Sequence, residues 1–282
     1  MNTVGLVVKK DERAEAEAEK LRQWLVARGL EAPVLTPAPG EGADATAASS
    51  IDSISRRVEL GVVLGGDGTL LFAARTMGRY GAPLLGVNMG GLGFLTEISL
   101  SDLYPTLEKV LAGKFEVQPR MTLEVEVRQA GLVRTSQRVL NDVVINKGAF
   151  ARILDFKVKV DKLNLSSYRA DGLIISTPTG STAYNLAAGG PIVHPAHESI
   201  ILTPICPFTL SNRSLILPRD VTVEIAVSRE PTDVLLTSDG QVLCPLEPED
   251  VVVVRRSERS INLVKNPYKD YFEILRTKLG WG

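Results

Sequence analysis

The sequence predicts two domains: an α/β domain with a parallel sheet, followed by a sandwich-like all-β domain. Over residues 1–118, apolar strand segments alternate with segments of helical periodicity, which is typical of a parallel α/β sheet. Over residues 119–265, apolar residues recur with a period of two in many short segments, which favours an antiparallel β domain. The tail, 266–282, has an amphipathic pattern and is expected to pack back on the first domain.

In the first domain, the helix after the first strand is indicated by Ala14, Ala18, Leu21 and Leu25, which fall on one helical face. The continuously apolar run 58–64 suits a strand that is buried on both faces. Strands are expected at 3–8, 34–35, 58–64 and 83–87, helices at 11–28, 69–78 and 101–113, and a loop rich in Pro, Gly, Ala and Ser at 37–50.

In the second domain, alternation is clearest where Leu123, Val125 and Val127 are separated by charged side chains. One helix, near 181–188, interrupts the β pattern. Strands are expected near 123–127, 139–145, 156–160, 173–176, 200–203, 214–217, 221–227, 234–236 and 250–255.

Composition excludes several classes of function. Lys plus Arg number 32 and Asp plus Glu number 33, so the net charge of −1 gives no electrostatic footprint for nucleic acid or an anionic membrane. No apolar run approaches the roughly 18 residues that span a bilayer, and the first residues lack a secretory pattern, so we expect a cytoplasmic protein. Cys206 and Cys244 form no CxxC motif, and His194 and His197 are expected in a loop, so these residues predict no metal site.

The segment GGDGT, at residues 65–69, directly follows a buried strand and opens a helix. Glycines let a ligand approach the backbone closely, and a helix N-terminus attracts phosphate. Asp67 would repel phosphate unless it bound a metal ion or accepted a proton, so it is a candidate base; the alternative is that it only caps the helix. The segment predicts a phosphate site formed by Gly65, Gly66, Gly68 and Thr69.

A second glycine-rich segment, NMGGLGFLT at residues 88–96, also follows a strand. It should lie at the same carboxyl edge of the sheet, where α/β folds bind ligands. Phe94 is a candidate to lie against a base or ribose, with an ordinary core phenylalanine as the alternative.

Two later segments carry polar residues in strand-like surroundings. Asn141 and Asp142 begin an apolar run, where their side chains need a partner or a ligand; an amide can read an adenine edge and a carboxylate can accept from ribose hydroxyls. The alternative is an ordinary turn. The long segment 169–191 contains a hydroxyl-dense loop, TPTGSTAY, which offers many hydrogen bonds to a sugar or amide.

Together, these four motifs resemble the NAD kinase family. The order GGDGT, NxGxLGFL, an Asn-acid pair and the TPTGSTAY…GGP block matches that family across residues 61–191, and Asp239-Gly240-Gln241 fits a later family motif. GGDGT alone also occurs in lipid kinases and phosphofructokinases, whereas the combination is specific. The resemblance implies phosphorylation of the adenosine ribose 2′-hydroxyl of NAD by ATP, at a site between the two domains.

The resemblance also implies roles for individual residues. Asp67 would be the base, Asn141 would read adenine, and Asp142 would bind ribose hydroxyls. Many family members have Glu in place of Asp142 and Ser in place of Ala187, so those contacts differ here. The implied NAD-binding residues are Asp67, Gly68, Asn141, Asp142, Arg152, Arg169, Asp171, Thr182, Ala183, Tyr184, Asn185, Leu186, Ala187 and Gln241.

The implied partners are NAD and ATP, with a divalent metal ion such as Mg²⁺ and a second copy of the chain in a homodimer or homotetramer. No protein ligand to the metal follows from the motifs. Two rival hypotheses stay open at this point: a lipid kinase of the GGDGT group, which the polar TPTGSTAY loop disfavours, and a dinucleotide sensor without catalytic activity.

Overall fold

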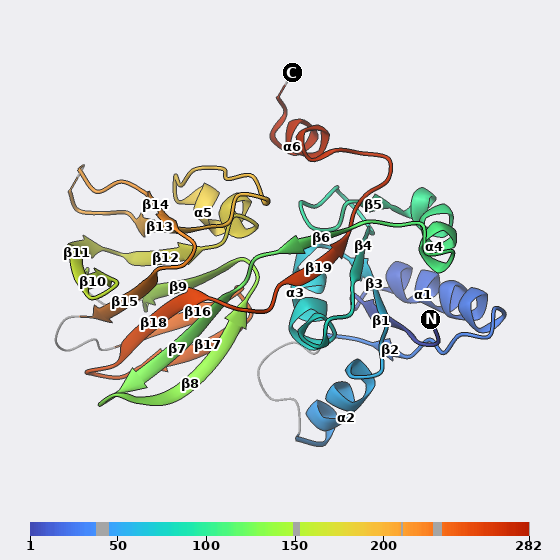
Figure 1. The fold of residues 1–282 in the computed structure, drawn as a ribbon, viewed down its shortest axis with the longest axis horizontal. Coiled ribbons are helices and arrows are strands. Elements are labelled where there is room, and N and C mark those ends of the chain that lie inside the picture. Colours follow the sequence, from blue (N-terminus) through green and yellow to red (C-terminus); the bar gives the residue numbers. More distant parts are fainter. Residues whose placement is uncertain (38–44, 149–152, 210, 228–232, 282) are drawn as a thin grey trace. The chain divides into compact units, whose positions relative to one another are not determined.

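A computed structural model describes residues 1–37, 45–148, 153–209, 211–227 and 233–281 (Figure 1). The chain divides into two units, Met1–Pro119 with Ile261–Gly282, and Arg120–Ser260. The first unit is α/β and the second is all-β, as the sequence predicts. In the described part of the chain, no helix is long and apolar enough to cross a bilayer.

The first unit is built on a seven-stranded sheet with the order β2-β1-β3-β4-β19-β6, in which β5 also pairs with β4. Pairs of β1 with β2 and β3, and of β4 with β3, β5 and β19, are parallel, which confirms the predicted sheet. The strands are β1 (Val4–Val8), β2 (Val34–Leu35), β3 (Leu60–Gly65), β4 (Leu84–Asn88), β5 (Ile98–Ser99), β6 (Val117–Arg120) and β19 (Ile261–Val264).

Helix α1 (Glu12–Val26) begins at Asp11, whose side chain accepts from the Ala14 N–H, and it buries the apolar face that the sequence predicts. Helices α3 (Asp67–Thr76) and α4 (Leu103–Leu111) also form near their expected positions. Helix α2 (Ala45–Ser55) corrects the expectation of a loop for residues 45–50, whose Ala- and Ser-rich composition had suggested a loop. Residues 38–44 of the expected loop lie outside the described residues.

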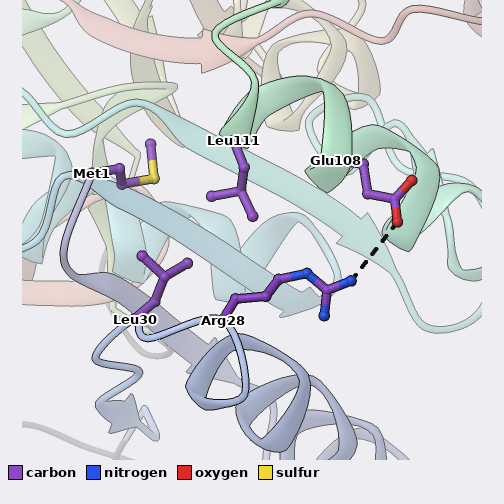
Figure 2. A pocket seen from close by; sticks show the side chains of 5 residues that line it. All are labelled: Met1, Arg28, Leu30, Glu108 and Leu111. Carbon is purple, nitrogen blue, oxygen red and sulfur yellow. Dashed lines mark ion pairs between the residues drawn. The ribbon is translucent and has the colours of Figure 1, made fainter.

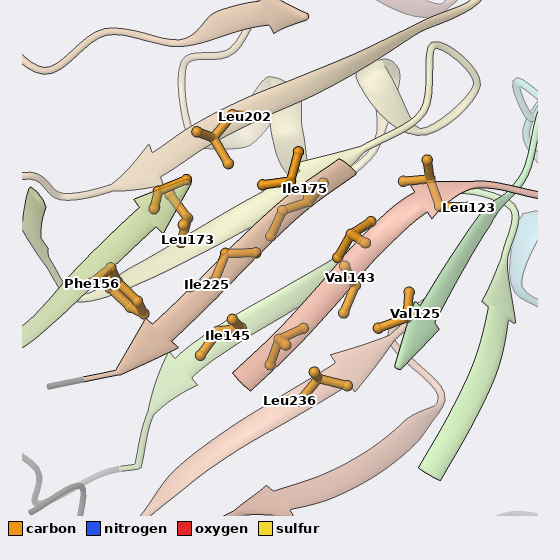
Figure 3. Packing of buried hydrophobic residues seen from close by; sticks show 14 of the residues in the cluster. Leu123, Val125, Val143, Ile145, Phe156, Leu173, Ile175, Leu202, Ile225 and Leu236 are labelled. Atoms are coloured by element: carbon orange, nitrogen blue, oxygen red, sulfur yellow. The ribbon is translucent and has the colours of Figure 1, made fainter. Parts of the chain in front are cut away.

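The second unit consists of two six-stranded antiparallel sheets, with the orders β11-β10-β15-β18-β7-β8 and β14-β13-β12-β9-β16-β17. Apolar side chains from both sheets form one core, which includes Leu123, Phe156, Ile175 and Leu236 (Figure 3). This arrangement confirms the sandwich-like domain, since each sheet buries one face against the other.

The strands of this unit largely follow the two-residue periodicity of the sequence. The structure adds β8, β11 and β17, which the sequence analysis did not predict as separate strands. Their bounds are β7 (Leu123–Gln129), β8 (Leu132–Val139), β9 (Asp142–Lys147), β10 (Leu154–Val160), β11 (Leu163–Ala170), β12 (Gly172–Ser176), β13 (Ser199–Ile205), β14 (Leu215–Pro218), β15 (Thr222–Val227), β16 (Val234–Ser238), β17 (Val242–Leu246) and β18 (Val251–Arg256). A short helix, α5 (Tyr184–Ala187), interrupts them.

The chain returns to the first unit earlier than the sequence analysis expected. We expected the second domain to continue to residue 265, but β19 pairs in parallel with β4 of the first sheet. Helix α6 (Tyr271–Leu279) follows and buries Ile274 and Leu275. The Asn266 side chain donates to the Glu97 carbonyl at 2.7 Å, so the tail packs back on the first unit as predicted.

Candidate active site

The two glycine-rich segments lie at one edge of the first sheet. Strands β3 and β4 are parallel neighbours, and their last residues, Gly65 and Asn88, are directly opposite each other. Segments 65–69 and 88–96 therefore leave the sheet together at its carboxyl edge, where open α/β sheets bind ligands. The Asn88 side chain accepts from the Gly90 N–H at 2.6 Å and donates to the Gly91 carbonyl, which folds the second segment back on itself.

Asp67 joins the two segments. Its Oδ1 accepts from the backbone N–H groups of Leu95 and Thr96, both at 3.0 Å, and from the Thr96 hydroxyl at 3.1 Å. Its Oδ2 accepts from the Phe94 N–H at 3.0 Å. The N-cap of α3 is Gly66, which makes no side-chain cap bond, so the alternative that Asp67 only caps this helix is wrong.

Close packing surrounds this carboxylate. A Cβ atom at Gly93 would collide with Asp67 Oδ1 and Thr96 Oγ1, so only glycine fits there. Phe94 is half-buried, and the Lys278 ammonium of α6 lies 5.7 Å from the centre of its ring. The Phe94 ring is therefore covered in part by the tail, on the same segment that holds Asp67.

In the second unit, Asp142 is the first residue of β9 and Asn141 directly precedes it. Both are buried, with 8% and 4% of their surface exposed. The Asn141 Oδ1 atom is buried without a hydrogen-bond partner among the described residues. A buried polar atom costs free energy when no partner is supplied to it.

Asp142 lies beside a second carboxylate. Burial, together with the negative charge of Asp239, raises the pKa of Asp142 to about 7. Asp239 follows β16, and its N–H donates to the Asp142 carbonyl at 2.9 Å. The charge on Asp142 is therefore sensitive to pH in the neutral range.

In the loop after β12, the hydroxyl groups of Thr177 and Ser181 form hydrogen bonds with backbone groups of the loop and of adjacent segments. The Thr177 hydroxyl donates to the Leu140 carbonyl at 2.6 Å and accepts from the Gly180 N–H. The Ser181 hydroxyl donates to the Pro178 carbonyl at 2.6 Å and accepts from the Val193 N–H. These hydroxyls shape the loop, so their density in the sequence did not by itself indicate ligand contacts.

Asn185 is also committed to the loop. Its side chain is fully buried, and its Nδ2 donates to the Ser181 and Pro191 carbonyls, both at 3.0 Å. Its Oδ1 accepts from the Thr203 hydroxyl at 2.7 Å. The neighbouring residues Thr182, Ala183 and Leu186 are half-buried, whereas Tyr184 and Ala187 are exposed.

The remaining candidate residues also belong to the second unit. Asp171 pairs with Lys147 at 2.7 Å, and the exposed Arg169 lies 5.1 Å from the ring centre of Phe208. Gln241 is half-buried in the turn after Asp239. Arg152 lies outside the described residues.

A hollow elsewhere in the first unit, of about 380 Å³, is lined by Met1, Arg28, Leu30, Glu108 and Leu111 (Figure 2). It lies near the amino end of β1, away from the carboxyl edge that carries the glycine-rich segments. Arg28 and Glu108 pair across it at 4.0 Å. Within the described ranges, no group of three or more His, Cys, Asp or Glu side chains is arranged to hold a metal ion.

The sequence analysis overlooked two contributors to these arrangements. Thr96 was read only as the end of a motif, and Asp239 only as part of a family pattern. An Asp-Gly pair after an apolar strand indicates a turn, but the backbone N–H groups that donate to the Asp239 carboxylate come from a distant segment.

Comparison with known proteins agrees with this picture. Residues 4–115 match the ATP-NAD kinase N-terminal domain, and residues 140–266 match the ATP-NAD kinase C-terminal domain. The NAD kinase of Geotalea daltonii is 48% identical over 272 residues, which cover 96% of this chain and 95% of the relative. The NAD kinase of Citrifermentans bemidjiense is 51% identical over 275 residues, which cover 96% of each chain.

Solved structures show the same fold. Yeast NADH kinase, crystallised with NADH, is similar with a TM-score of 0.85 and 25% identity, over 100% of this chain and 88% of the yeast chain. An NAD kinase from Archaeoglobus fulgidus, crystallised with ATP, gives a TM-score of 0.77 and 24% identity, over 98% of this chain and 99% of the archaeal chain. On the family matches and the full-length identity, the chain belongs to the ATP-NAD kinase family.

Proposed function

We propose that this chain transfers the terminal phosphoryl group of ATP to the adenosine ribose 2′-hydroxyl of NAD, giving NADP and ADP. The observation that carries the proposal is the identity of about half of all residues, over nearly the full length, with proteins named NAD kinase. The site geometry supplies suitable groups for both substrates.

Asp67 is proposed as the base that accepts the proton of the 2′-hydroxyl. Its Oδ1 accepts three hydrogen bonds, whereas its Oδ2 accepts one among the described residues. Oδ2 therefore keeps a lone pair for a substrate hydroxyl. As the ribose oxygen attacks the terminal phosphorus and the bond to the leaving ADP oxygen breaks, the hydroxyl proton passes to Oδ2.

For the dinucleotide, we propose that Asn141 reads adenine and that Asp142 accepts from ribose hydroxyls. The unpartnered Asn141 Oδ1 supports this assignment, because the exocyclic amine of adenine is a matching donor. The exposed or half-buried candidates, which are Phe94, Arg169, Asp171, Thr182, Ala183, Tyr184, Leu186, Ala187 and Gln241, stay in the proposed binding set, as does Arg152.

For the donor, we propose that ATP phosphates bind near Gly65, Gly66, Gly68 and Thr69 at the start of α3, where backbone N–H groups favour an anion. A Mg²⁺ ion would be held mainly by those phosphates, since Mg²⁺ keeps several waters and needs only one or two carboxylates. Bound there, Mg²⁺ would neutralise phosphate charge.

The decisive experiment is to incubate the purified chain with NAD and Mg-ATP and to measure NADP. We expect NADP to form in proportion to enzyme. A lipid kinase would phosphorylate a lipid alcohol and leave NAD unchanged. A sensor would bind NAD in calorimetry without turnover, so each rival has its own outcome.

We further propose a homodimer or homotetramer. Large apolar side chains are exposed on the second unit, including Leu132 at 76%, Leu163 at 74% and Phe208 at 67%. Strands β8 and β11 are also sheet edges, which favour pairing with another chain. Sedimentation would contradict this proposal if the mass stayed near the 30.5 kDa of one chain at micromolar concentration.

A further inference from the structure

The carboxylate of Asp239 binds three successive backbone N–H groups of a distant segment. It accepts from Leu140 at 2.9 Å, from Asn141 at 2.7 Å and from Asp142 at 3.2 Å. Asp239 itself is in the left-handed region, with a φ of 50°, which an Asp tolerates better than most residues. The turn after β16 is therefore shaped around the residues that begin β9.

The same segment is held through its carbonyl groups. The Asn141 carbonyl accepts from the Thr177 N–H at 2.8 Å and from the Ser176 hydroxyl at 3.2 Å. A Cβ atom at Gly180 would collide with the Asn141 backbone, so the loop after β12 packs directly against it. With its backbone fixed on both sides, Asn141 has few ways to move its buried amide.

We propose that Asp239 is a positioning residue for dinucleotide binding, which fixes the backbone of Asn141 and Asp142, the two residues proposed to bind the adenosine part of NAD. The inference deepens the proposed function and rests on it for the identity of the ligand. Asp239 acts through its two neighbours and makes no contact with the substrate in this scheme.

The electrostatics of the pair give the inference a second, pH-dependent readout. Among the described residues, Asp239 is the charged group that acts on Asp142, while Ser176 of β12, which pairs with Asp142, is neutral. The nearby charge of Asp239 adds to burial in raising the pKa of Asp142. Removing that charge should therefore shift the titration of Asp142 toward acid.

The test compares Asp239→Asn with a matched control, Asp161→Asn. Asp161 is also left-handed, with a φ of 48°, and its carboxylate accepts from a backbone N–H, that of Thr222, at 2.9 Å. It lies in the turn between β10 and β11, away from Asn141. Both variants lose one carboxylate charge and keep an amide of the same size.

At about pH 8, where Asp142 is largely ionised in both proteins, we expect Asp239→Asn to raise the KM for NAD about tenfold and to change the KM for ATP by less than about twofold. In the wild type, NAD affinity should improve as pH rises through about 7, because the Asp142 carboxylate accepts from ribose hydroxyls when charged. In Asp239→Asn this midpoint should fall, because the charge that adds to burial in raising the pKa of Asp142 is removed. Asp161→Asn should match the wild type in all three measurements.

The proposal is overturned if Asp239→Asn leaves the KM for NAD within about twofold of the Asp161→Asn value, or if the pH midpoint stays at its wild-type position. A purely structural role would lower the melting temperature without moving the midpoint. If the wild type formed no NADP but bound NAD in calorimetry, the same comparison would be made on the dissociation constant. No NAD binding by the wild type would overturn both this inference and the proposed function.

A double-variant cycle adds a second readout. If Asp239 acts through Asn141, then Asp239→Asn should cause little further loss of NAD affinity in an Asn141→Ala background. Additive losses would mean that Asp239 acts independently. Should Asp239→Asn fail to fold, Asp239→Ser, whose hydroxyl still accepts one N–H, replaces it in the same comparisons.

Discussion

Two aspartates, one in each unit, use the same hydrogen-bonding arrangement. Asp67 accepts from the N–H groups of three successive residues, 94–96, and Asp239 accepts from those of 140–142. In each unit a carboxylate thus fixes a backbone segment that is distant in sequence. The arrangement satisfies buried donors that would otherwise lack partners.

The difference lies in what each fixed segment carries. The segment held by Asp67 includes Gly93 and approaches the carboxylate closely, so the loop positions Asp67 itself. The segment held by Asp239 carries the buried side chains of Asn141 and Asp142. The comparison indicates that the first unit positions the Asp67 carboxylate itself, whereas Asp239 positions the side chains of two other residues, Asn141 and Asp142.

The largest expected effect distinguishes the two aspartates, because Asp67 should affect kcat and Asp239 should affect the KM for NAD. Asp67→Asn keeps the size of the side chain but cannot accept a proton, so we predict that kcat falls about 10²-fold or more. The affinity for NAD should weaken less. Steady-state kinetics on folded protein check this, and near-normal turnover would show that another group is the base. A change confined to the KM for NAD, with kcat unaffected, would make Asp67 resemble Asp239 and would contradict its role as the base.

The next effect concerns the group that Asp239 is proposed to position. Asn141→Ala removes the amide whose Oδ1 is buried and unpartnered, so we predict a KM for NAD about tenfold higher, since 1.4 kcal/mol corresponds to a factor of ten. The KM for ATP serves as the internal control and should change little. Equal effects on both substrates would place the adenine pocket elsewhere.

Local sequence patterns predicted the fold class of each unit, because hydrophobic periodicity reflects which side chains are buried. They failed where burial or pairing is not local. Strand β8 was missed because most of its side chains are exposed or half-buried, so it shows no clear period of two. Residues 261–264, which form β19, were placed in the second domain and not predicted as a strand, because the pairing of β19 with β4 joins residues far apart in the chain. Residue composition alone made the start of α2 look like a loop.

For the candidate site, residue chemistry identified candidates but not their partners. Asp67 was predicted as a candidate base, yet the loop that holds it could not be predicted, because hydrogen bonds to backbone groups leave no trace in the residue types of that loop. Hydroxyl groups in the TPTGSTAY loop suggested ligand contacts, whereas the structure pairs Thr177 and Ser181 with carbonyls. A hydroxyl serves either purpose, so its partner depends on tertiary structure.

Asp142 offers a third test, in which function and stability should oppose each other. Its pKa is raised to about 7 in the folded chain, above the ordinary value of 3.8, so ionisation destabilises the fold as pH rises from about 4 to 7. Asp142→Asn removes this penalty. We predict a gain on the order of 1 kcal/mol or more at pH 8, and little gain near pH 4.

The same variant should weaken NAD binding at pH 8 by about fivefold, because the amide is a weaker acceptor for ribose hydroxyls than a carboxylate. Urea unfolding followed by circular dichroism measures the stability, and calorimetry measures the NAD affinity. A gain in stability that did not depend on pH would contradict the assigned titration. Unchanged NAD affinity would instead remove Asp142 from the binding set.

The smallest effect tests how firmly the first unit holds Asp67. Thr96 is fully buried, and its hydroxyl is the one side-chain donor to Asp67 among the described residues. Thr96→Val keeps the shape and leaves the three backbone donors in place. We predict that kcat falls about threefold, the scale of one hydrogen bond, with both KM values nearly unchanged.

Thr106 provides the matched control for this change. It is 1% exposed in α4, and its hydroxyl has no hydrogen-bond partner in the described part of the chain. Thr106→Val should therefore leave kcat unchanged, whereas Thr96→Ser, which restores the hydroxyl, should recover most of the activity lost in Thr96→Val. If Thr96→Val matched the wild type, the three backbone donors of residues 94–96 would be sufficient to hold Asp67. The difference between the two aspartates would then lie in what each one positions, which is the Asp67 carboxylate itself in the first unit and the segment of Asn141 and Asp142 in the second.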